Sequence, residues 1–354
     1  MNLTSFQQNH LADCDTRYGE REQMLGLSFH SPGYHTRVPS GQWVHPTVPS
    51  LEYALLLART GEPARQQRAS TILQQVLNLQ DTDPASPTYG IWPYLLEEPI
   101  AAMAGPDFNW ADFCGARIAE ALAEHRWEAA LTARLRAALG HAAWCILRRN
   151  IRPAYTNICL MGGGVTAVAG ELLGEPRLLE YGRARLEKLL VHARYHGNFT
   201  EYNSPAYTTI ALHETERILQ LSRDPVTRDR AEQLRRIAWQ TIATHFHAGL
   251  QQWAGPHARA YSDRLDTKLA AELSERTGIA IHAPDSEPES IWTGPLDLTV
   301  RPLPCPDDLR SHFRNVTPGE LRQVVIRRQP ESADTEAVTW VTDTACLGSI
   351  NQSR

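Results

Sequence analysis

Apolar residues recur at helical spacing along most of the chain. One clear stripe consists of Ala69, Ile72, Leu73, Val76 and Leu77. Such a stripe is typical of a helix with one buried face. The same periodicity predicts a helix that opens with residues 51–57 and is closed by the turn at 61–63. It also predicts helices over residues 110–123, 127–149, 157–173, 176–193, 206–222 and 225–248, and a short helix over residues 97–103. The chain is therefore predicted to be mainly α-helical.

Short turns separate the predicted helices. The turn at residues 61–63 reads Gly-Glu-Pro, and Pro176 and Pro225 stand at predicted helix starts, where proline costs little. Consecutive helices joined in this way pack as antiparallel hairpins. A series of hairpins forms either a solenoid or a closed α/α toroid. Because no fixed-period repeat is visible, the common helical solenoids are disfavoured, and we expect an incomplete α/α toroid.

The two ends of the chain differ from its helical middle. Residues 1–48 are interrupted by Pro and Gly and are predicted to be an irregular N-terminal arm. Residues 49–278 carry the helical pattern and are expected to form the toroid. Residues 279–354 contain Pro-rich loops and β-branched runs at 298–300, 323–327 and 338–342. This last part predicts the start of a β-sandwich domain that is not complete.

The composition is that of an ordinary soluble globular protein, with 42% hydrophobic and 21% charged residues. A net charge of −5 disfavours a nucleic-acid partner. Lys188 and Lys268 are the only lysines among 35 basic residues, so 33 are arginines. Arginine binds carboxylates and sulfates well. The excess of arginine indicates either an acidic ligand or a compositional bias of the source genome.

The six cysteines include no CxxC pair, so neither a disulfide framework nor a zinc site is indicated. We expect no metal and no other cofactor. The N-terminus lacks a basic region followed by an apolar run, and we find no stretch of the roughly 18 apolar residues that a membrane span needs. The expectation is a cytoplasmic chain without a membrane partner, or a secreted one if its N-terminus is incomplete.

Two motifs offer groups suited to binding sugars. Asn109 and Trp110 stand at the start of a predicted helix, and an aromatic face stacks on the C–H side of a sugar ring. Asn157 stands at the start of another helix and can offer its amide to a carboxylate. Each asparagine can instead serve as a helix cap. The triplet at residues 162–164 is Gly-Gly-Gly without a phosphate-loop framework, so it predicts close helix packing.

A polar and aromatic loop precedes the helix predicted over residues 206–222. It contains Glu201, Tyr202 and Asn203, and Tyr207 follows at the helix start. We expect Glu201 and Asn203 to bind substrate.

A second loop follows the helix predicted over residues 225–248. It carries His257, Arg259 and Tyr261 at alternating positions. In an extended segment, residues two apart face the same side. Three polar groups are therefore predicted to point together.

The order of these motifs resembles that of the polysaccharide lyases related to chondroitin and hyaluronan lyases. The matching motifs are Asn109-Trp110, the Tyr-Thr-Asn sequence that ends at Asn157, the Gly-Asn-Phe-Thr-Glu-Tyr sequence that ends at Tyr202, and the loop with Arg259. The resemblance rests on short motifs spread over about residues 50–350. It implies a catalytic α/α toroid followed by a β-sandwich.

The resemblance also implies roles for individual residues. Trp110 would stack on a sugar, Asn157 would bind a uronate carboxylate, and Arg259 would complete the site. Tyr202 falls where the family has a histidine. The position of the family's tyrosine holds Ala211 here.

With alanine at that position, Tyr207 or Tyr261 is left as the substitute. The preferred hypothesis is a lyase that cleaves an acidic polysaccharide by β-elimination, with Tyr202 or His257 as the base. Another tyrosine would protonate the leaving oxygen.

Two other functions stay open. A glycoside hydrolase on the same toroid would need two carboxylates, such as Asp112 and Glu201, at the separation that hydrolysis requires. A sugar-binding protein without catalysis, including a truncated relative of the lyases, would need only the aromatic and polar surface.

Overall fold

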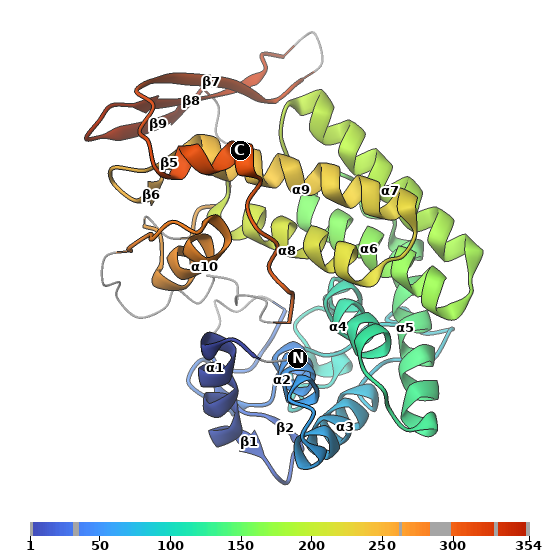
Figure 1. The fold of residues 1–354 in the computed structure, drawn as a ribbon. Coiled ribbons are helices and arrows are strands. Elements are labelled where there is room, and N and C mark those ends of the chain that lie inside the picture. The colour runs from blue at the N-terminus through green and yellow to red at the C-terminus, as the bar shows by residue number, and fades with distance from the viewer. Residues whose placement is uncertain (1–2, 31–34, 262–263, 284–298, 329–331, 352–354) are drawn as a thin grey trace. The chain divides into compact units, whose positions relative to one another are not determined.

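The structure, a computed structural model, describes residues 3–30, 35–261, 264–283, 299–328 and 332–351 (Figure 1). It confirms that the protein is mainly α-helical. The residues group into two compact units. Unit 1 comprises Met1–Asn150, Met161–Gly182 and Leu221–Arg223, and unit 2 comprises Ile151–Leu160, Arg183–Gln220 and Asp224–Arg354. These limits do not follow the predicted boundaries at residues 49 and 279, and the division into folding domains stays a prediction.

Unit 1 is built on helix pairs. Its helices include α1 (Ser5–Thr16), α2 (Thr47–Arg59), α3 (Pro63–Leu77), α4 (Trp110–Glu124), α5 (Ala129–Arg149) and most of α6 (Thr156–Leu173). α2 packs against α3 and α4, and α4 packs against α5. Leu51, Leu55 and Ile72 are fully buried in this core. The apolar stripe predicted between residues 69 and 77 is the buried face of α3.

The first 48 residues are not irregular throughout, which corrects the prediction. Thr4 caps α1 through a capping box with Gln7. Strand β1 (Tyr18–Gly19) pairs with β2 (Met24–Leu25), and β3 (Leu27–Ser28) pairs with β4 (Trp43–Val44). The helix escaped prediction because its buried side includes only two apolar residues between positions 7 and 16, Leu11 and Cys14.

The later helices confirm the limits that the apolar periodicity predicted. α7 (Pro176–His196), α8 (Pro205–Leu221) and α9 (Pro225–His245) begin and end within one turn of the predicted limits. The short helix expected over residues 97–103 is a 3-10 turn, η1 (Ile100–Ala102). α10 (Thr267–Thr277) was not predicted.

The core of unit 2 lies between α7, α8, α9 and α10. Phe199, Leu234 and Trp239 are buried there, and Phe313 of η2 (Asp307–Phe313) packs against Trp239. A two-residue pairing of β5 (Phe246–His247) with β6 (Gln252–Trp253) follows α9. This pairing leads into the loop that carries His257 and Arg259.

A three-stranded antiparallel sheet lies near the C-terminal end of the chain. β7 (Gly319–Ile326), β8 (Thr335–Val341) and β9 (Cys346–Ile350) are arranged in the order β7-β8-β9 (Figure 1). Two of its strands correspond to the predicted runs at 323–327 and 338–342. In the third predicted run, residue 298 lies outside the described residues and residues 299–300 are not a strand.

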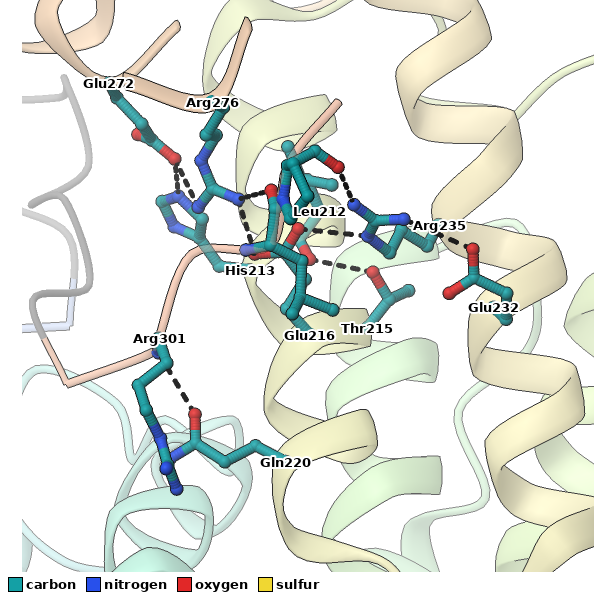
Figure 2. Close-up of polar contacts among 12 residues, drawn as sticks. Leu212, His213, Thr215, Glu216, Gln220, Glu232, Arg235, Glu272, Arg276 and Arg301 are labelled. Carbon is teal, nitrogen blue, oxygen red and sulfur yellow. Dashed lines mark hydrogen bonds and ion pairs between the residues drawn. The ribbon is translucent and has the colours of Figure 1, made fainter. Parts of the chain in front are cut away.

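A buried ion network joins α8 to α9 and α10 within unit 2. Figure 2 shows Glu216 of α8 between two arginines: it accepts from Arg235 Nε at 3.1 Å and from Arg276 Nη1. Glu272 of α10 accepts from Arg276 Nη2 at 2.6 Å and pairs with His213. All five side chains are buried. Removing one partner from such a network is costly, so the network fixes the position of α8.

One helix of the described residues, α6, is long and apolar enough to span a membrane by length and composition, contrary to the expectation that no stretch reaches this limit. Of that window, 83% is buried inside the protein. A core helix of a soluble protein passes the same test. α6 therefore gives only weak support to a membrane segment.

Candidate functional site

Five of the predicted site residues lie together in unit 2. We call Asn157, Glu201, Tyr207, Arg259 and Tyr261 the Glu201 cluster. The buried Glu201 carboxylate is its centre: Oε2 accepts from the Asn157 main-chain N–H at 3.1 Å, and Oε1 accepts from Arg259 Nη1 at 2.8 Å. Glu201 therefore ties the first turn of α6 to the loop after β6.

The other side of the Glu201 cluster is aromatic. The Arg259 guanidinium stacks on the Tyr207 ring, and the hydroxyl groups of Tyr207 and Tyr261 are 3.1 Å apart. Arg259 also makes a side-chain hydrogen bond with Tyr261. The side chain of Arg259 is 43% exposed, and Tyr261 is 39% exposed. A ligand from solvent can therefore reach a cation and a phenol at the same place.

The start of α8 places Tyr207. Ser204 Oγ accepts from the Tyr207 main-chain N–H at 3.1 Å, which is a side-chain cap. Pro205 follows as the first residue of the helix, where it sacrifices no hydrogen bond. The sequence Ser-Pro at 204–205 thus sets where the helix begins.

Asn203 holds the two site loops together. Its Nδ2 donates to the carbonyl oxygens of Ala254 and Pro256 at 2.9 and 3.0 Å, and its Oδ1 accepts from Trp253 Nε1 at 2.6 Å. Its φ of 45° lies in the left-handed region, which asparagine tolerates better than most residues. Asn203 was predicted to bind substrate, but these contacts make it part of the scaffold.

His257 is held by main-chain carbonyl groups on both sides. Its Nδ1 lies 2.6 Å from the Asn203 oxygen and its Nε2 lies 3.2 Å from the Trp253 oxygen. Burial lowers the pKa of its imidazole although both carbonyl contacts act in the opposite direction. With both ring nitrogens facing the protein, His257 is poorly placed to act as the base that the sequence suggested.

Tyr202 packs into a small apolar cluster next to the three-stranded sheet. Its neighbours there are Val325, Ile326 and Ala337. Its main-chain oxygen accepts from the Ala258 N–H at 3.1 Å. These contacts give Tyr202 a structural role, and the half-exposed Tyr261 is the better candidate for proton transfer.

The sheet also supports the loop that carries Arg259. Thr339 of β8 donates its hydroxyl to the Gly255 oxygen at 2.7 Å. A Cβ atom on Gly348 of β9 would lie 2.3 Å from Gly255 C and from Pro256 N. Only glycine permits this approach at position 348, so the sheet lies directly against residues 255–256.

Burial and charge set the protonation of the Glu201 cluster. Burial raises the pKa of Glu201, and the Asn157 N–H and Arg259 offset only part of this rise. Burial and the hydrogen bond with Tyr261 raise the pKa of Tyr207 far above its usual value. Burial disfavours the charge on Arg259, but Tyr207 and Glu201 outweigh burial and raise its pKa. At neutral pH Tyr207 is therefore a phenol and Arg259 is charged.

Two buried polar atoms at the start of α6 have no hydrogen-bond partner in the described structure. They are Asn157 Oδ1 and Thr156 Oγ1, on residues that are 3% and 1% exposed. Leaving such atoms unpaired costs free energy, which a water or a ligand group at this helix start would relieve. Sequence reasoning selected Asn157 but missed Thr156, although both stand at the same helix start.

The remaining predicted residues belong to unit 1. Trp110 donates from Nε1 to Thr47 Oγ1 at 2.8 Å, and its ring centroid lies 3.9 Å from that of Tyr94. Asn109 Oδ1 accepts from Arg149 Nη2 at 3.0 Å. These contacts hold Trp110 and Asn109 within unit 1, and their part in substrate binding stays a prediction.

The carboxylates of the hydrolase hypothesis are both paired with arginine. Asp112 is buried and lies 3.4 Å from Arg149 Nη1. Glu201 is paired with Arg259 in the other unit. A carboxylate that neutralises a guanidinium is a poor general acid, so this arrangement gives hydrolysis no support.

One group of side chains offers ligands for a metal ion. His10, Asp13 and Cys14 of α1 have ligand atoms within 4.8 Å of one another. However, Arg17 forms an ion pair with Asp13 and lies 3.8 Å from the Cys14 sulfur, so a cation is already in place. Burial raises the pKa of Cys14 to about 11, which keeps the thiol protonated. This group therefore does not support a metal-dependent function.

A family model matches residues 28–282 of the chain, and its description reads "Domain of unknown function (DUF8769)". No curated protein and no solved structure matches the chain. The matched range contains the whole Glu201 cluster and ends before the three-stranded sheet.

Proposed function

The chain belongs to the DUF8769 family, and we propose that it is a lyase that cleaves a uronate-containing polysaccharide by β-elimination. The observation that carries this proposal is the stack of Arg259 on Tyr207, with the Tyr261 hydroxyl within hydrogen-bond distance of the Tyr207 hydroxyl. The stack offers a cation for the carboxylate of a uronate and two phenols for proton transfer. The finer description of the fold, an incomplete α/α toroid followed by the start of a β-sandwich, is part of the same proposal and is supported by the series of helical hairpins and the three-stranded sheet.

Elimination requires that the charge on the uronate carboxyl group be stabilised while the neighbouring C5 proton leaves. The exposed edge of Arg259 would bind this group together with the side-chain amide of Asn157, whose main-chain N–H is joined to Arg259 through the Glu201 carboxylate. Donors fixed in a partly buried site stabilise such developing charge far better than water does.

Tyr261 takes the C5 proton in this mechanism. The Arg259 guanidinium stacks on the Tyr207 ring and hydrogen-bonds to Tyr261, so both phenols are held beside the cation that binds the carboxylate. As the C5–H bond breaks, its electrons form the C4–C5 double bond and the C4–O bond breaks. Tyr207, whose raised pKa keeps it protonated, donates a proton to the leaving oxygen.

The contact between the two phenols resets the site. As Tyr261 takes up the C5 proton it gives its own hydroxyl proton to Tyr207, which has given its proton to the leaving oxygen, so both residues are phenols before and after the turnover. This single transfer crosses the 3.1 Å hydroxyl contact. The reaction therefore needs no external acid or base.

The test is an elimination assay with a panel of uronate polysaccharides, which follows the ultraviolet absorbance of the unsaturated product. We expect turnover with at least one polymer and none with its carboxyl-reduced, neutral form. New reducing ends without unsaturated product would identify a hydrolase. Oligosaccharide binding without any bond cleavage would identify a sugar-binding protein, and either result would overturn the lyase assignment.

A further inference from the structure

The Glu201 cluster is electrically neutral before any ligand binds. It contains one guanidinium and one carboxylate, which form an ion pair at 2.8 Å. Its other members are two phenols and an amide. A uronate that binds to Arg259 would add a second carboxylate to a site where Glu201 is only 7% exposed. Two ionised carboxylates that share one partly buried guanidinium repel each other.

We propose that a uronate binds at Arg259 together with one proton, which Glu201 takes up. The inference rests on the lyase proposal and concerns the same site. Protonated Glu201 keeps its Oε2 as acceptor for the Asn157 N–H. Its other oxygen becomes a donor toward the ligand carboxylate, and Arg259 pairs with that carboxylate instead.

The geometry favours Glu201 over its neighbours as the proton acceptor. Tyr207 and Tyr261 bring hydroxyl groups that are phenols already, and the loop after β6 brings His257, whose ring nitrogens both face carbonyl groups. The contact from α6 is a main-chain N–H, which cannot take up a proton. Burial already raises the pKa of Glu201, so its protonation costs less than that of an exposed glutamate.

The thermodynamic linkage between proton uptake and uronate binding fixes how the Kd depends on pH. In the free protein Glu201 pairs with Arg259 as a carboxylate, and in the proposed complex it is protonated, so binding consumes a proton. The Kd should therefore rise with pH, by up to about tenfold per unit when one whole proton is taken up. Above the pKa that Glu201 has in the complex, the Kd should become independent of this group.

Isothermal titration calorimetry tests this coupling. Full-length protein is titrated with glucuronate and with galacturonate, which lack a glycosidic bond at C4 and cannot be cleaved by elimination. Titrations in buffers of different ionisation enthalpy give the number of protons exchanged. We expect uptake that approaches one proton for wild type and for Glu275→Gln, an exposed control in α10. We expect no uptake for Glu201→Gln, with an affinity that no longer depends on pH.

Binding by wild type without proton uptake, or uptake that persists in Glu201→Gln, would overturn the coupling and leave the lyase proposal standing. Absence of uronate binding would overturn the coupling as well, and the polysaccharide assay then decides the lyase proposal separately. Circular dichroism of Glu201→Gln shows whether that variant is folded. If it is not, Glu201→Asp serves instead, and its shorter carboxylate should take up a proton with a different pH midpoint.

Discussion

The guanidinium carbon of Arg259 lies 4.0 Å from the centroid of the Tyr207 ring. This contact joins α8 to a loop more than fifty positions later in the sequence. It holds the cation over the face of the phenol, while the buried Glu201 carboxylate accepts from one of its nitrogens. Arg259 thus has one edge for the protein and one for a ligand.

Replacing Arg259 with lysine should reduce kcat/KM by about a hundredfold to a thousandfold, as loss of a well-placed charge-stabilising donor does elsewhere. Lysine keeps the charge but lacks the planar group that stacks on Tyr207 and bonds to both Glu201 and Tyr261. The elimination assay measures the effect. Arg314→Lys changes an exposed arginine of the same unit and should leave the rate unchanged; equal rates for the two variants would contradict the role of Arg259.

The rates of the phenylalanine variants of the two tyrosines should depend differently on the leaving group. Tyr261→Phe removes the base and should lower kcat by about a hundredfold to ten-thousandfold with any substrate. Tyr207→Phe removes the acid, so a uronate with an aryl leaving group at O4, which needs no protonation, should recover most of its rate. Rates of both variants with natural and aryl substrates are the measurement. Recovery in Tyr261→Phe instead would reverse the two assignments.

Asn203→Ala should destabilise the loop of residues 254–257 because three hydrogen bonds disappear. We expect a loss of about 1 to 3 kcal/mol in the free energy of unfolding, the range found when buried polar groups lose a partner. Urea denaturation followed by circular dichroism measures it. Asn203→Gly allows the same backbone conformation but also lacks the three hydrogen bonds. If this variant were as stable as wild type, the φ value and not the hydrogen bonding would account for the role of Asn203.

The ion network of Figure 2 predicts a loss of stability in acid. Burial opposes the charge of Glu272, but His213 and Arg276 outweigh burial and lower its pKa to about 2. A lowered carboxyl pKa stabilises the fold above the unfolded value of about 4.3 and loses that effect as pH falls toward the folded value. Glu272→Gln should be less stable than wild type at pH 7, and the difference should narrow below about pH 4.

Denaturant titrations across this pH range are the measurement for Glu272→Gln, and Glu275→Gln of the same helix is the control. A constant difference between wild type and Glu272→Gln would contradict the assigned linkage. A difference that widened in acid would show that folding raises the pKa of Glu272 instead of lowering it.

Helices were the part of the fold that the sequence predicted best. α4 to α9 each carry an apolar face and a turn at either end, and both signals are local. α10 was missed although Asp266 caps its start and Gly278, with φ of 69°, ends it. Its eleven residues bury only three apolar side chains, so its periodicity was too short to stand out.

The site was predicted in its residues but not in their arrangement. Glu201 and Arg259 were both selected, but nothing local says that they pair across fifty-eight positions. Tyr202 was given a catalytic role from its place in a motif. Its side chain packs instead with Val325 and Ala337, which belong to strands more than a hundred residues later. Which of two adjacent loop residues faces a sheet depends on a part of the chain that the motif does not contain.

The close approach of Gly348 to Gly255 has a consequence for building hybrid proteins from this family. A chimera that exchanged residues 319–350 for those of a relative would also exchange the surface on which the Arg259 loop rests. Its substrate preference would then depend on the donor of the sheet, even if every residue of the Glu201 cluster came from this chain. The three strands thus help to determine the site. A recombination boundary should lie before residue 252, so that the Arg259 loop and the sheet come from the same parent.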